Sequence, residues 1–247
     1  MAAIRDQIRD WWDEDATTYD ASPGHALSDG VERAAWRGAL ERVLPPAPSR
    51  VLDVGTGTGA LALLAAELGH EVTGMDLSAG MLAKARDKAA AAGLEVSFIE
   101  GVAGETPEGP FDAVMERHVL WTLPEPVAAL RAWRERTVPG GRLAVFEGSW
   151  GGEGPFVGAR DALEGFLRRC FRMQDAHHGP YPPEVLEHLP LRSTSSPGPF
   201  IAAINEAGWT RVRIARLRDV EWAVERRDPW PLGLLGRRTR YALIADA

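Results

Sequence analysis

The chain has 247 residues, 45% of them apolar, and a net charge of −7. This composition is that of a globular protein with one sizeable unit, and the acidic balance argues against a nucleic-acid partner. Cys170 is the only cysteine, which excludes an internal disulfide and a cysteine-based zinc site. We also expect a cytoplasmic protein without a membrane partner, because there is no long apolar run and no apolar signal core.

The first fifty residues carry two helical patterns. Apolar residues recur at helical spacing over residues 2–16, which predicts a short amphipathic helix. A second helix is predicted over about 29–44, where the proline-rich stretch 45–48 ends it. We expect residues 1–48 to form an N-terminal helical lid.

From residue 50 onward, strand patterns alternate with helix patterns. The predicted elements are strand 51–54, helix 58–68, strand 71–75, helix 78–92, strand 95–99, strand 111–115, helix 125–136 and strand 142–147. Such alternation predicts an α/β fold with a parallel sheet and helices on both faces. Ligands of these sheets bind beyond the carboxyl ends of the strands, so we expect residues 49–147 to form the ligand-binding core.

The alternation stops after residue 147. Residues 148–200 are rich in glycine, proline and histidine and hold one helical pattern, 156–174, so we expect an inserted cap. The remaining predicted elements are a helix at 199–207 and strands at 210–218 and 238–245. We expect residues 201–247 to complete the sheet, and the whole chain to be a single globular unit.

A glycine turn is the most informative motif. The apolar strand 51–54 runs into Gly55, Gly57 and Gly59, and a helix follows. Such a turn lets a ligand approach the backbone, and the helix N-terminus offers unpaired N–H groups. Asp76 ends the next strand, where a carboxylate can accept hydrogen bonds from ribose hydroxyls. We therefore expect a nucleoside-containing cofactor, although the turn also fits the dinucleotide-binding pattern.

Four segments extend this motif in a specific order. They are 51–59, 74–82, 111–121 and 139–143. Together they resemble the class I S-adenosylmethionine-dependent methyltransferases, in particular the small-molecule branch related to ubiquinone and menaquinone biosynthesis enzymes. The resemblance covers roughly residues 50–150. It implies a Rossmann-like, seven-stranded, mostly parallel sheet whose last strand is antiparallel, with S-adenosyl-L-methionine as cofactor and S-adenosyl-L-homocysteine as product.

The resemblance also implies roles for matching residues. Asp53 would lie near the methionine amino group, and Asp76 would hold the ribose hydroxyls. The other implied cofactor contacts are Tyr19, Gly55, Thr56, Gly57, Gly59, Leu77, Met81, Gly101, Val102, Ala103 and Arg117. A core role for Met81 and a hinge role for Tyr19 are the alternatives. The family usually has an aspartate where this chain has Val102, so we expect a cofactor anchored more weakly, by on the order of 1 kcal/mol.

His118 is the first candidate for the chemistry, because it follows the fourth strand at the mouth of the site. It would act as a general base or orient the substrate, and packing at the strand end is the alternative. Trp121 would wall the acceptor pocket or belong to the core. In the cap, His177, His178 and Tyr181 are candidate substrate contacts. We expect no metal site, because this local cluster lacks a distant third ligand.

The expected reaction is in-line methyl transfer to an oxygen, nitrogen or carbon atom of a small molecule. Nine tryptophans suggest a planar, partly apolar acceptor. A nicotinamide-dependent oxidoreductase is one alternative, although the chain has no Tyr-x-x-x-Lys. The others are a non-catalytic binding module and an RNA methyltransferase using the C-terminal arginines, which we interpret instead as a solvated face. We expect a monomer or a homodimer.

Overall fold

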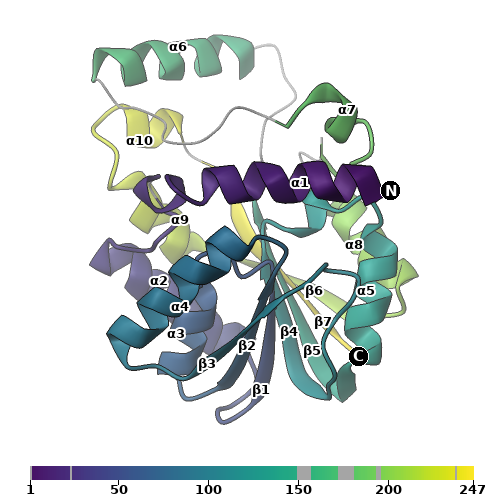
Figure 1. Cartoon of the computed structure of the whole chain (residues 1–247). Helices are drawn as coiled ribbons and strands as arrows, with labels where there is room; N and C mark the ends of the chain where they lie inside the picture. Colours follow the sequence, from purple (N-terminus) through teal and green to yellow (C-terminus); the bar gives the residue numbers. More distant parts are fainter. Residues whose placement is uncertain (1, 23, 149–156, 172–180, 193–195, 237) are drawn as a thin grey trace.

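The computed structural model describes residues 2–22, 24–148, 157–171, 181–192, 196–236 and 238–247. Within them, one seven-stranded sheet has the order β3-β2-β1-β4-β5-β7-β6 (Figure 1). The strands are β1 (Arg50–Val54), β2 (Glu71–Asp76), β3 (Val96–Glu100), β4 (Phe111–Arg117), β5 (Thr137–Gly148), β6 (Thr210–Arg216) and β7 (Arg240–Asp246). Strands β1 to β5 pair in parallel, and β7 is antiparallel to both β5 and β6. The predicted fold class is confirmed.

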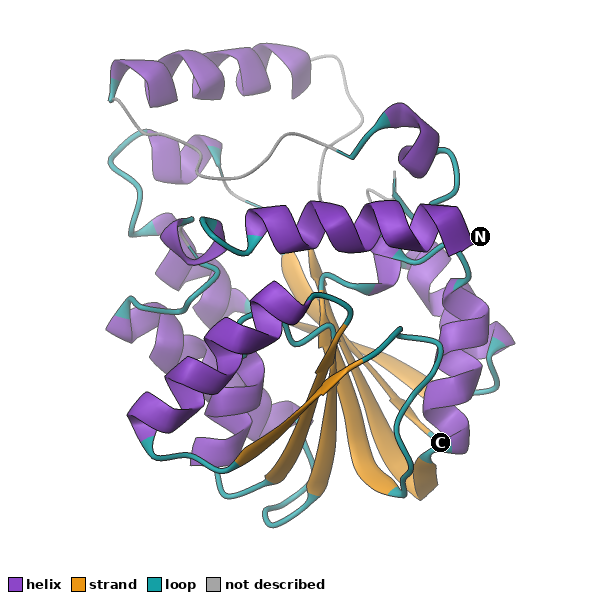
Figure 2. Cartoon of the chain, in the orientation of Figure 1, coloured by secondary structure: helices purple, strands orange, loops and turns teal. Residues whose placement is uncertain are grey.

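Helices cover both faces of the sheet (Figure 2). They are α1 (Ala2–Asp15), α2 (Gly30–Val43), α3 (Ala60–Glu67), α4 (Ala79–Ala92), α5 (Pro126–Glu135), α6 (Val157–Cys170), α7 (Pro183–Leu186), α8 (Gly198–Glu206), α9 (Arg218–Glu225) and α10 (Leu232–Leu235), with short 3-10 helices η1 (Tyr19–Ala21) and η2 (Leu120–Thr122). One core lies between the sheet and α2, α3 and α9, and a second lies between the sheet and α5 and α8. Helix α1 crosses above the carboxyl ends of the strands (Figure 2).

Local chemistry sets the helix ends. The Asp29 side chain accepts hydrogen bonds from the N–H groups of Val31 and Glu32 in the first turn of α2, and the Ser78 side chain accepts one from the Met81 N–H in α4. Helix α4 ends at Gly93 in the left-handed conformation (φ 65°), which a glycine adopts without steric penalty. These caps lie where the sequence patterns place the helix boundaries.

Several boundaries differ from the prediction. Strand β5 begins at Thr137 rather than 142, because Gly140 and Gly141 form an irregularity inside the strand instead of a turn before it. A Cβ atom on Gly141 would lie 2.9 Å from the Asp112 carbonyl oxygen, so the close backbone approach needs a glycine there. The predicted strand 210–218 ends at Arg216, and the unpredicted helix α9 begins at Arg218.

Candidate active site

The glycine turn joins β1 to α3 at the carboxyl edge of the sheet. Gly55, Gly57 and Gly59 have φ values of 64°, 55° and 83°, a region that side chains other than glycine rarely adopt. A Cβ atom on Gly55 would lie 2.2 Å from a methyl carbon of Val119, in the segment that follows β4. The turn therefore presents backbone without side chains, which a ligand can approach closely. The contact between Gly55 and Val119 also fixes the spacing between the ends of β1 and β4.

Asp76 ties the end of β2 to this turn. Its Oδ2 accepts a hydrogen bond from the Gly57 N–H at 2.8 Å, and its Oδ1 accepts one from the Ser78 N–H at 2.9 Å. Burial raises the pKa of Asp76 to about 6, while the backbone hydrogen bonds act in the opposite direction. Each carboxylate oxygen can accept a further hydrogen bond, so the side chain suits a vicinal diol.

Asp53 lies on the other side of the turn, in the last part of β1. Its Oδ2 accepts a hydrogen bond from Thr56 Oγ1 at 2.7 Å. Burial raises the pKa of Asp53 to about 7, and the Thr56 bond and the Arg117 charge lower it. A buried carboxyl of this kind gains from a cationic partner such as an ammonium group.

Asp53 and the glycine turn line a small cavity of about 20 Å³. Its lining residues are Tyr19, Asp53, Gly55, Thr56, Gly57, Thr58, Ala60, Leu61 and Arg117. This volume holds about one water molecule. The cavity is therefore much smaller than a nucleoside, and Tyr19 forms part of its lining.

A larger open hollow of about 690 Å³ lies at the opposite end of the sheet, beside the first residues of β1, β2 and β3. Parallel sheets bind ligands at the carboxyl ends of their strands. The small cavity at the glycine turn, and not the larger hollow, is therefore the candidate active site.

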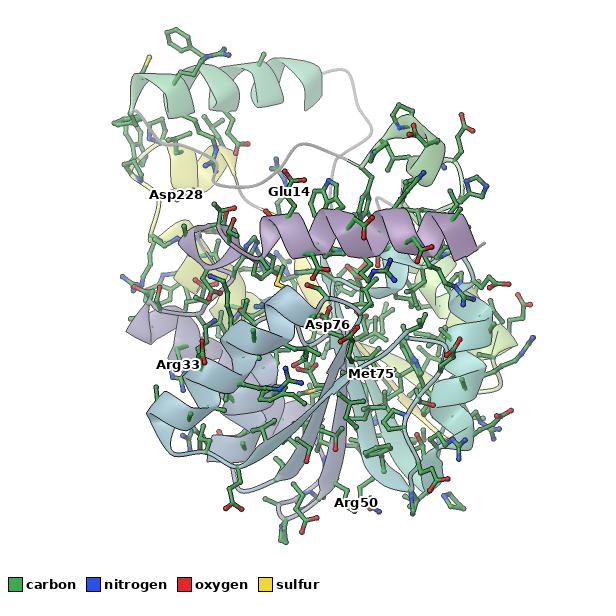
Figure 3. The ribbon with its side chains drawn as sticks, viewed as in Figure 1. Glu14, Arg33, Arg50, Met75, Asp76 and Asp228 are labelled. Carbon is green, nitrogen blue, oxygen red and sulfur yellow. The ribbon has the colours of Figure 1, made fainter. Side chains whose placement is uncertain are left out.

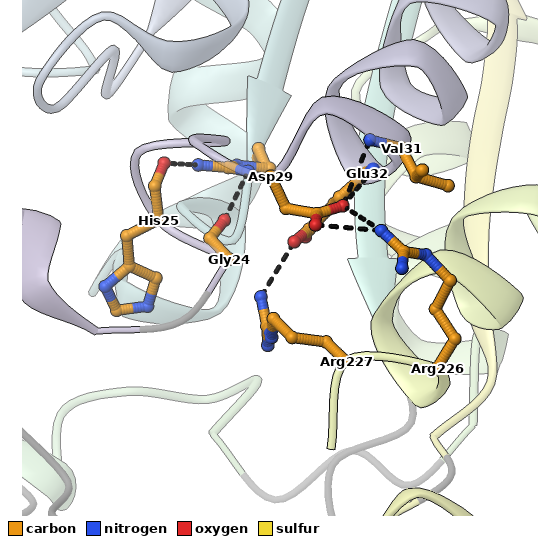
Figure 4. Close-up of polar contacts among 8 residues, drawn as sticks. Gly24, His25, Asp29, Val31, Glu32, Arg226 and Arg227 are labelled. Carbon is orange, nitrogen blue, oxygen red and sulfur yellow. Dashed lines mark hydrogen bonds and ion pairs between the residues drawn. The ribbon is translucent and has the colours of Figure 1, made fainter. Parts of the chain in front are cut away.

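Residues 11–22, 24 and 25, which we call the covering segment, meet this cavity through Tyr19. The Tyr19 ring stacks on His25 with centroids 4.1 Å apart, and His25 Nδ1 lies 2.9 Å from the Tyr19 carbonyl oxygen. From β4, the Arg117 guanidinium donates to the carbonyl oxygens of Gly24 and His25 at 3.3 and 3.2 Å (Figure 4). Arg117 thus contacts the covering segment through its side chain, in addition to lining the cavity.

Two aspartates of this segment, Asp13 and Asp20, hydrogen-bond to residues of the core, and the sequence did not predict these partners. Asp13 accepts hydrogen bonds from Ser78 Oγ at 2.5 Å and from the Gly80 N–H at 3.1 Å. Asp20 accepts a hydrogen bond from Thr58 Oγ1 at 2.7 Å and pairs with Lys88 at 2.7 Å. We call Asp13, Asp20 and their partners the clasp. Figure 3 shows Asp76 beneath α1 and Glu14 above it, on the solvent side.

His118 follows β4 with an unusual backbone. Its φ is 63°, and its N–H donates to the Phe146 carbonyl oxygen at 3.1 Å. Its Nδ1 lies 3.1 Å from Oε2 of Glu147, whose side chain is fully buried in β5, whereas the His118 side chain is 26% exposed. Burial, followed by the charges of Arg240 and Arg117, holds the pKa of His118 well below its usual value. The imidazole is therefore neutral at pH 7.

Glu116 is a second buried carboxyl at this edge. It accepts hydrogen bonds from the N–H groups of Val119 and Leu120 at 2.7 and 3.3 Å, which fixes the start of η2. Burial raises the pKa of Glu116 to about 8. Neither Glu116 nor Glu147 carries a sequence signal of its own, because each is an isolated acidic residue that follows an apolar stretch.

Aromatic side chains from three segments meet above the strand ends. Tyr181 lies 4.9 Å from Trp11, 6.3 Å from Trp12 and 5.9 Å from Trp121, measured between ring centroids. We call these four residues the aromatic wall. Tyr181 is only 4% exposed, so it contributes packing within this wall. The other predicted cap contacts, His177 and His178, lie outside the described residues.

The predicted adenine-side residues are packed closely. Met81 is buried in α4, and Leu77 packs against the cluster that includes the aromatic wall. A Cβ atom on Gly101 would lie 2.6 Å from Met75 Cε. The carbonyl oxygens of Val102 and Ala103 already accept hydrogen bonds from the Glu105 N–H and the Trp133 Nε1–H.

Many C-terminal arginines pair with acidic side chains of the same chain. Arg226 pairs with Asp29 at 2.7 Å, and Arg227 pairs with Glu32 at 2.8 Å (Figure 4). Arg216 pairs in the same way with the buried Glu221. These contacts favour the interpretation of the C-terminal arginines as a charged surface that pairs within the protein rather than as an RNA-binding patch. Among the residues that the structure describes, no group of three potential metal ligands occurs.

Comparison with known proteins agrees with this geometry. A methyltransferase domain model matches residues 51–141. A demethylmenaquinone methyltransferase of Beutenbergia cavernae is 33% identical over 206 residues, which are 81% of this chain and 82% of that protein. The chain belongs to the class I S-adenosylmethionine-dependent methyltransferases. S-adenosylmethionine is therefore its cofactor, and the dinucleotide interpretation of the glycine turn is rejected.

Other relatives match over a shorter part of their length. A demethylmenaquinone methyltransferase of Thermus thermophilus is 42% identical over 138 residues, or 54% of this chain and 62% of that protein. In fold, the methyltransferase resembles the Haemonchus contortus phosphoethanolamine N-methyltransferase 2 solved with S-adenosyl-L-methionine, with a TM-score of 0.61 and 18% identity over 96% of this chain and 59% of that one. Within the described residues, every helix is too short or too polar to cross a bilayer.

Proposed function

We propose that this methyltransferase methylates a small, planar and partly apolar acceptor. The observation that carries the proposal is the aromatic wall, because flat apolar rings pack well against tryptophan and tyrosine. Trp12 of this wall lies 6.0 Å, between ring centroids, from Tyr19, which lines the cavity at the glycine turn. The two relatives described above are named demethylmenaquinone methyltransferases. Demethylmenaquinone-type rings are therefore the first acceptors to test.

The cofactor site in this proposal is built around two carboxyl groups. Asp76 accepts hydrogen bonds from the ribose hydroxyls, since its oxygens already align on the turn through Gly57 and Ser78. Asp53 faces the methionine ammonium group, whose positive charge would return the carboxyl to its ionised form. Leu77 and Met81 flank the adenine, a contact that suits a polarisable methionine.

The covering segment has a role of its own. We assign residues 1–48 to a lid, with Tyr19 over the methionine end of the cofactor. This assignment is supported by Tyr19 lining the small cavity and by the clasp. A closed lid excludes water from the site and holds the reactants in line.

Methyl transfer requires little of the protein beyond holding the acceptor and the methyl donor in line. S-adenosylmethionine supplies, when bound, a methyl group on a positively charged sulfur whose leaving group is a neutral thioether. The chain orients the acceptor and desolvates it, which accounts for most of the acceleration of such a displacement. His118, neutral at pH 7, accepts the proton that an acidic acceptor loses.

The decisive test is calorimetric titration of the full chain with S-adenosylhomocysteine, with NAD as the comparison. We expect micromolar binding of S-adenosylhomocysteine, loss of binding in Asp76→Ala, and no NAD binding. Asp112→Ala is the matched control, because Asp112 accepts a backbone hydrogen bond from Arg50 at the far end of the sheet. NAD binding alone would contradict the cofactor assignment.

Methyl transfer from labelled S-adenosylmethionine to demethylmenaquinone-type acceptors then tests the acceptor class. Cofactor binding without turnover on any planar acceptor would contradict the proposed acceptor class.

A further inference from the structure

We propose that Glu147 is a positioning residue that holds His118 with its proton on Nδ1, so that Nε2 is the atom that accepts the proton of the acceptor. The inference rests on the proposed function for the presence of an acceptor beside His118. The orientation of the imidazole, by contrast, can be tested without any acceptor.

The strained backbone conformation of His118 indicates that the position of its ring matters for function. A non-glycine residue with φ near 60° is strained by on the order of 1 kcal/mol or more. The His118 N–H is anchored on the Phe146 carbonyl oxygen, directly before Glu147 in β5. The strained conformation therefore brings the ring beside the Glu147 carboxyl group, at 3.1 Å.

The position of Glu147 supports the same conclusion. Its side chain has no exposed surface. Tyr241 lies directly opposite Glu147 in β7, and the next pair on the same face, Val145 and Leu243, is buried and aliphatic. A buried carboxyl group destabilises a fold unless a partner compensates for its lost hydration. The contact with His118 at 3.1 Å supplies a polar partner of this kind for the buried Glu147 carboxyl group.

The pairing fixes the tautomer of the ring. When the carboxylate accepts a hydrogen bond from Nδ1–H, the lone pair of the neutral imidazole resides on Nε2. In the reaction, the acceptor loses its proton to Nε2 as the new bond to the methyl carbon forms. The carbon–sulfur bond breaks with its electron pair going to sulfur, so the positive charge moves from sulfur to the imidazolium, which Glu147 stabilises.

Other charged groups around His118 act against that imidazolium. They are Arg117 of β4, Arg240 of β7 and His25 of the covering segment. With positive or titratable groups on these three sides, Glu147 is the compensating carboxyl group in contact with the ring. Its removal should therefore make protonation of His118 still less favourable.

The test is nitrogen-15 NMR of the histidine rings in the full chain, with S-adenosylhomocysteine titrated into each variant. We expect the Nδ1–H tautomer for His118 in the wild type and in Glu147→Gln, whose amide oxygen can still accept the bond. Glu147→Leu should shift the ring to the Nε2–H tautomer. The matched control is Glu116→Gln, which changes a buried carboxyl on the adjacent strand that bonds only backbone N–H groups. This control should leave the tautomer unchanged.

Turnover and titration supply the second readout. Glu147→Leu should lower kcat by about 100-fold or more with unchanged S-adenosylhomocysteine affinity, and Glu147→Gln should lose less. If Glu147→Leu does not fold, the NMR titration of Glu147→Gln decides, and we expect a lower His118 pKa than in the wild type. An unchanged tautomer in Glu147→Leu, or an unchanged titration in Glu147→Gln, would overturn the inference. Absence of turnover in the wild type would instead count against the proposed acceptor class.

Discussion

The two halves of the candidate site are built in different ways. The cofactor half, from Asp53 to Ser78, is held together by hydrogen bonds between residues at most 19 positions apart. The acceptor half and the lid depend on residues far apart in sequence: His118 and Glu147 are 29 positions apart, and Asp13 of the lid and Ser78 are 65 positions apart. The first half is a local motif with fixed backbone geometry, and the second depends on how the whole chain folds.

Because the backbone of the cofactor half is fixed, we expect substitutions in its glycine turn to cause the largest loss of stability. Gly55→Ala would place a Cβ atom 2.2 Å from Val119 in a backbone conformation that favours glycine. We expect the free energy of unfolding to fall by about 3 kcal/mol, from strain and overpacking together. Urea unfolding measures this, with Gly104→Ala as control, since the described residues leave open space around that glycine. Equal effects of the two substitutions would mean that the turn is not constrained by Val119.

The buried carboxyl groups of both halves predict a stability that depends on pH. The pKa values of Asp53, Asp76 and Glu116 are raised to about 7, 6 and 8, so the folded protein binds protons that the unfolded chain releases. This contribution is fully present below about pH 4 and is lost as pH rises through these folded values.

Without cofactor, we therefore expect unfolding to require at least about 2 kcal/mol more at pH 5 than at pH 8. Chemical unfolding at both values measures the difference, and Asp53→Asn should reduce it, because the amide does not titrate. A protein that is more stable at pH 8 would show that these groups are not buried as described.

Substitutions in the clasp should have a smaller effect, on cofactor dissociation, and they test the lid independently of the cofactor half. Asp13→Ala removes the hydrogen bonds to Ser78 and Gly80 while leaving the glycine turn intact. We expect S-adenosylhomocysteine to dissociate about tenfold faster, which corresponds to about 1.4 kcal/mol. Stopped-flow measurements test this, with Glu14→Ala as the control, because Glu14 is exposed on the opposite side of α1 (Figure 3). Identical dissociation rates in the two variants would remove the clasp from the proposal.

The smallest predicted effect is a gain in affinity for S-adenosylhomocysteine. Val102→Asp places a carboxylate where the family resemblance implies a contact with the adenine amino group, so S-adenosylhomocysteine should bind about fivefold more tightly, or about 1 kcal/mol. Calorimetry measures the change, and Val102→Ala should show none. Weaker binding in Val102→Asp would mean that the adenine does not lie beside this loop.

The same contrast explains what the sequence could and could not predict. Asp76 and the glycines were recognisable because local spacing alone creates their geometry. Asp13, Lys88 and Glu147 were not, since each acquires its partner only when distant strands and helices meet. Helix α9 was missed because one of its three buried residues is the charged Glu221, so the apolar face formed by Val220 and Ala223 is short.

The order of the strands has a consequence for synthesis on the ribosome. Strand β6 pairs only with β7, and β7 lies between β5 and β6 although it is made after both. Until residues 240–246 emerge from the exit tunnel, β5 has an open ladder edge that any extended chain could occupy, and β6 has no strand to join. Folding of this half of the sheet is therefore postponed until translation has passed β7, whereas β1 to β4 can already assemble on the nascent chain.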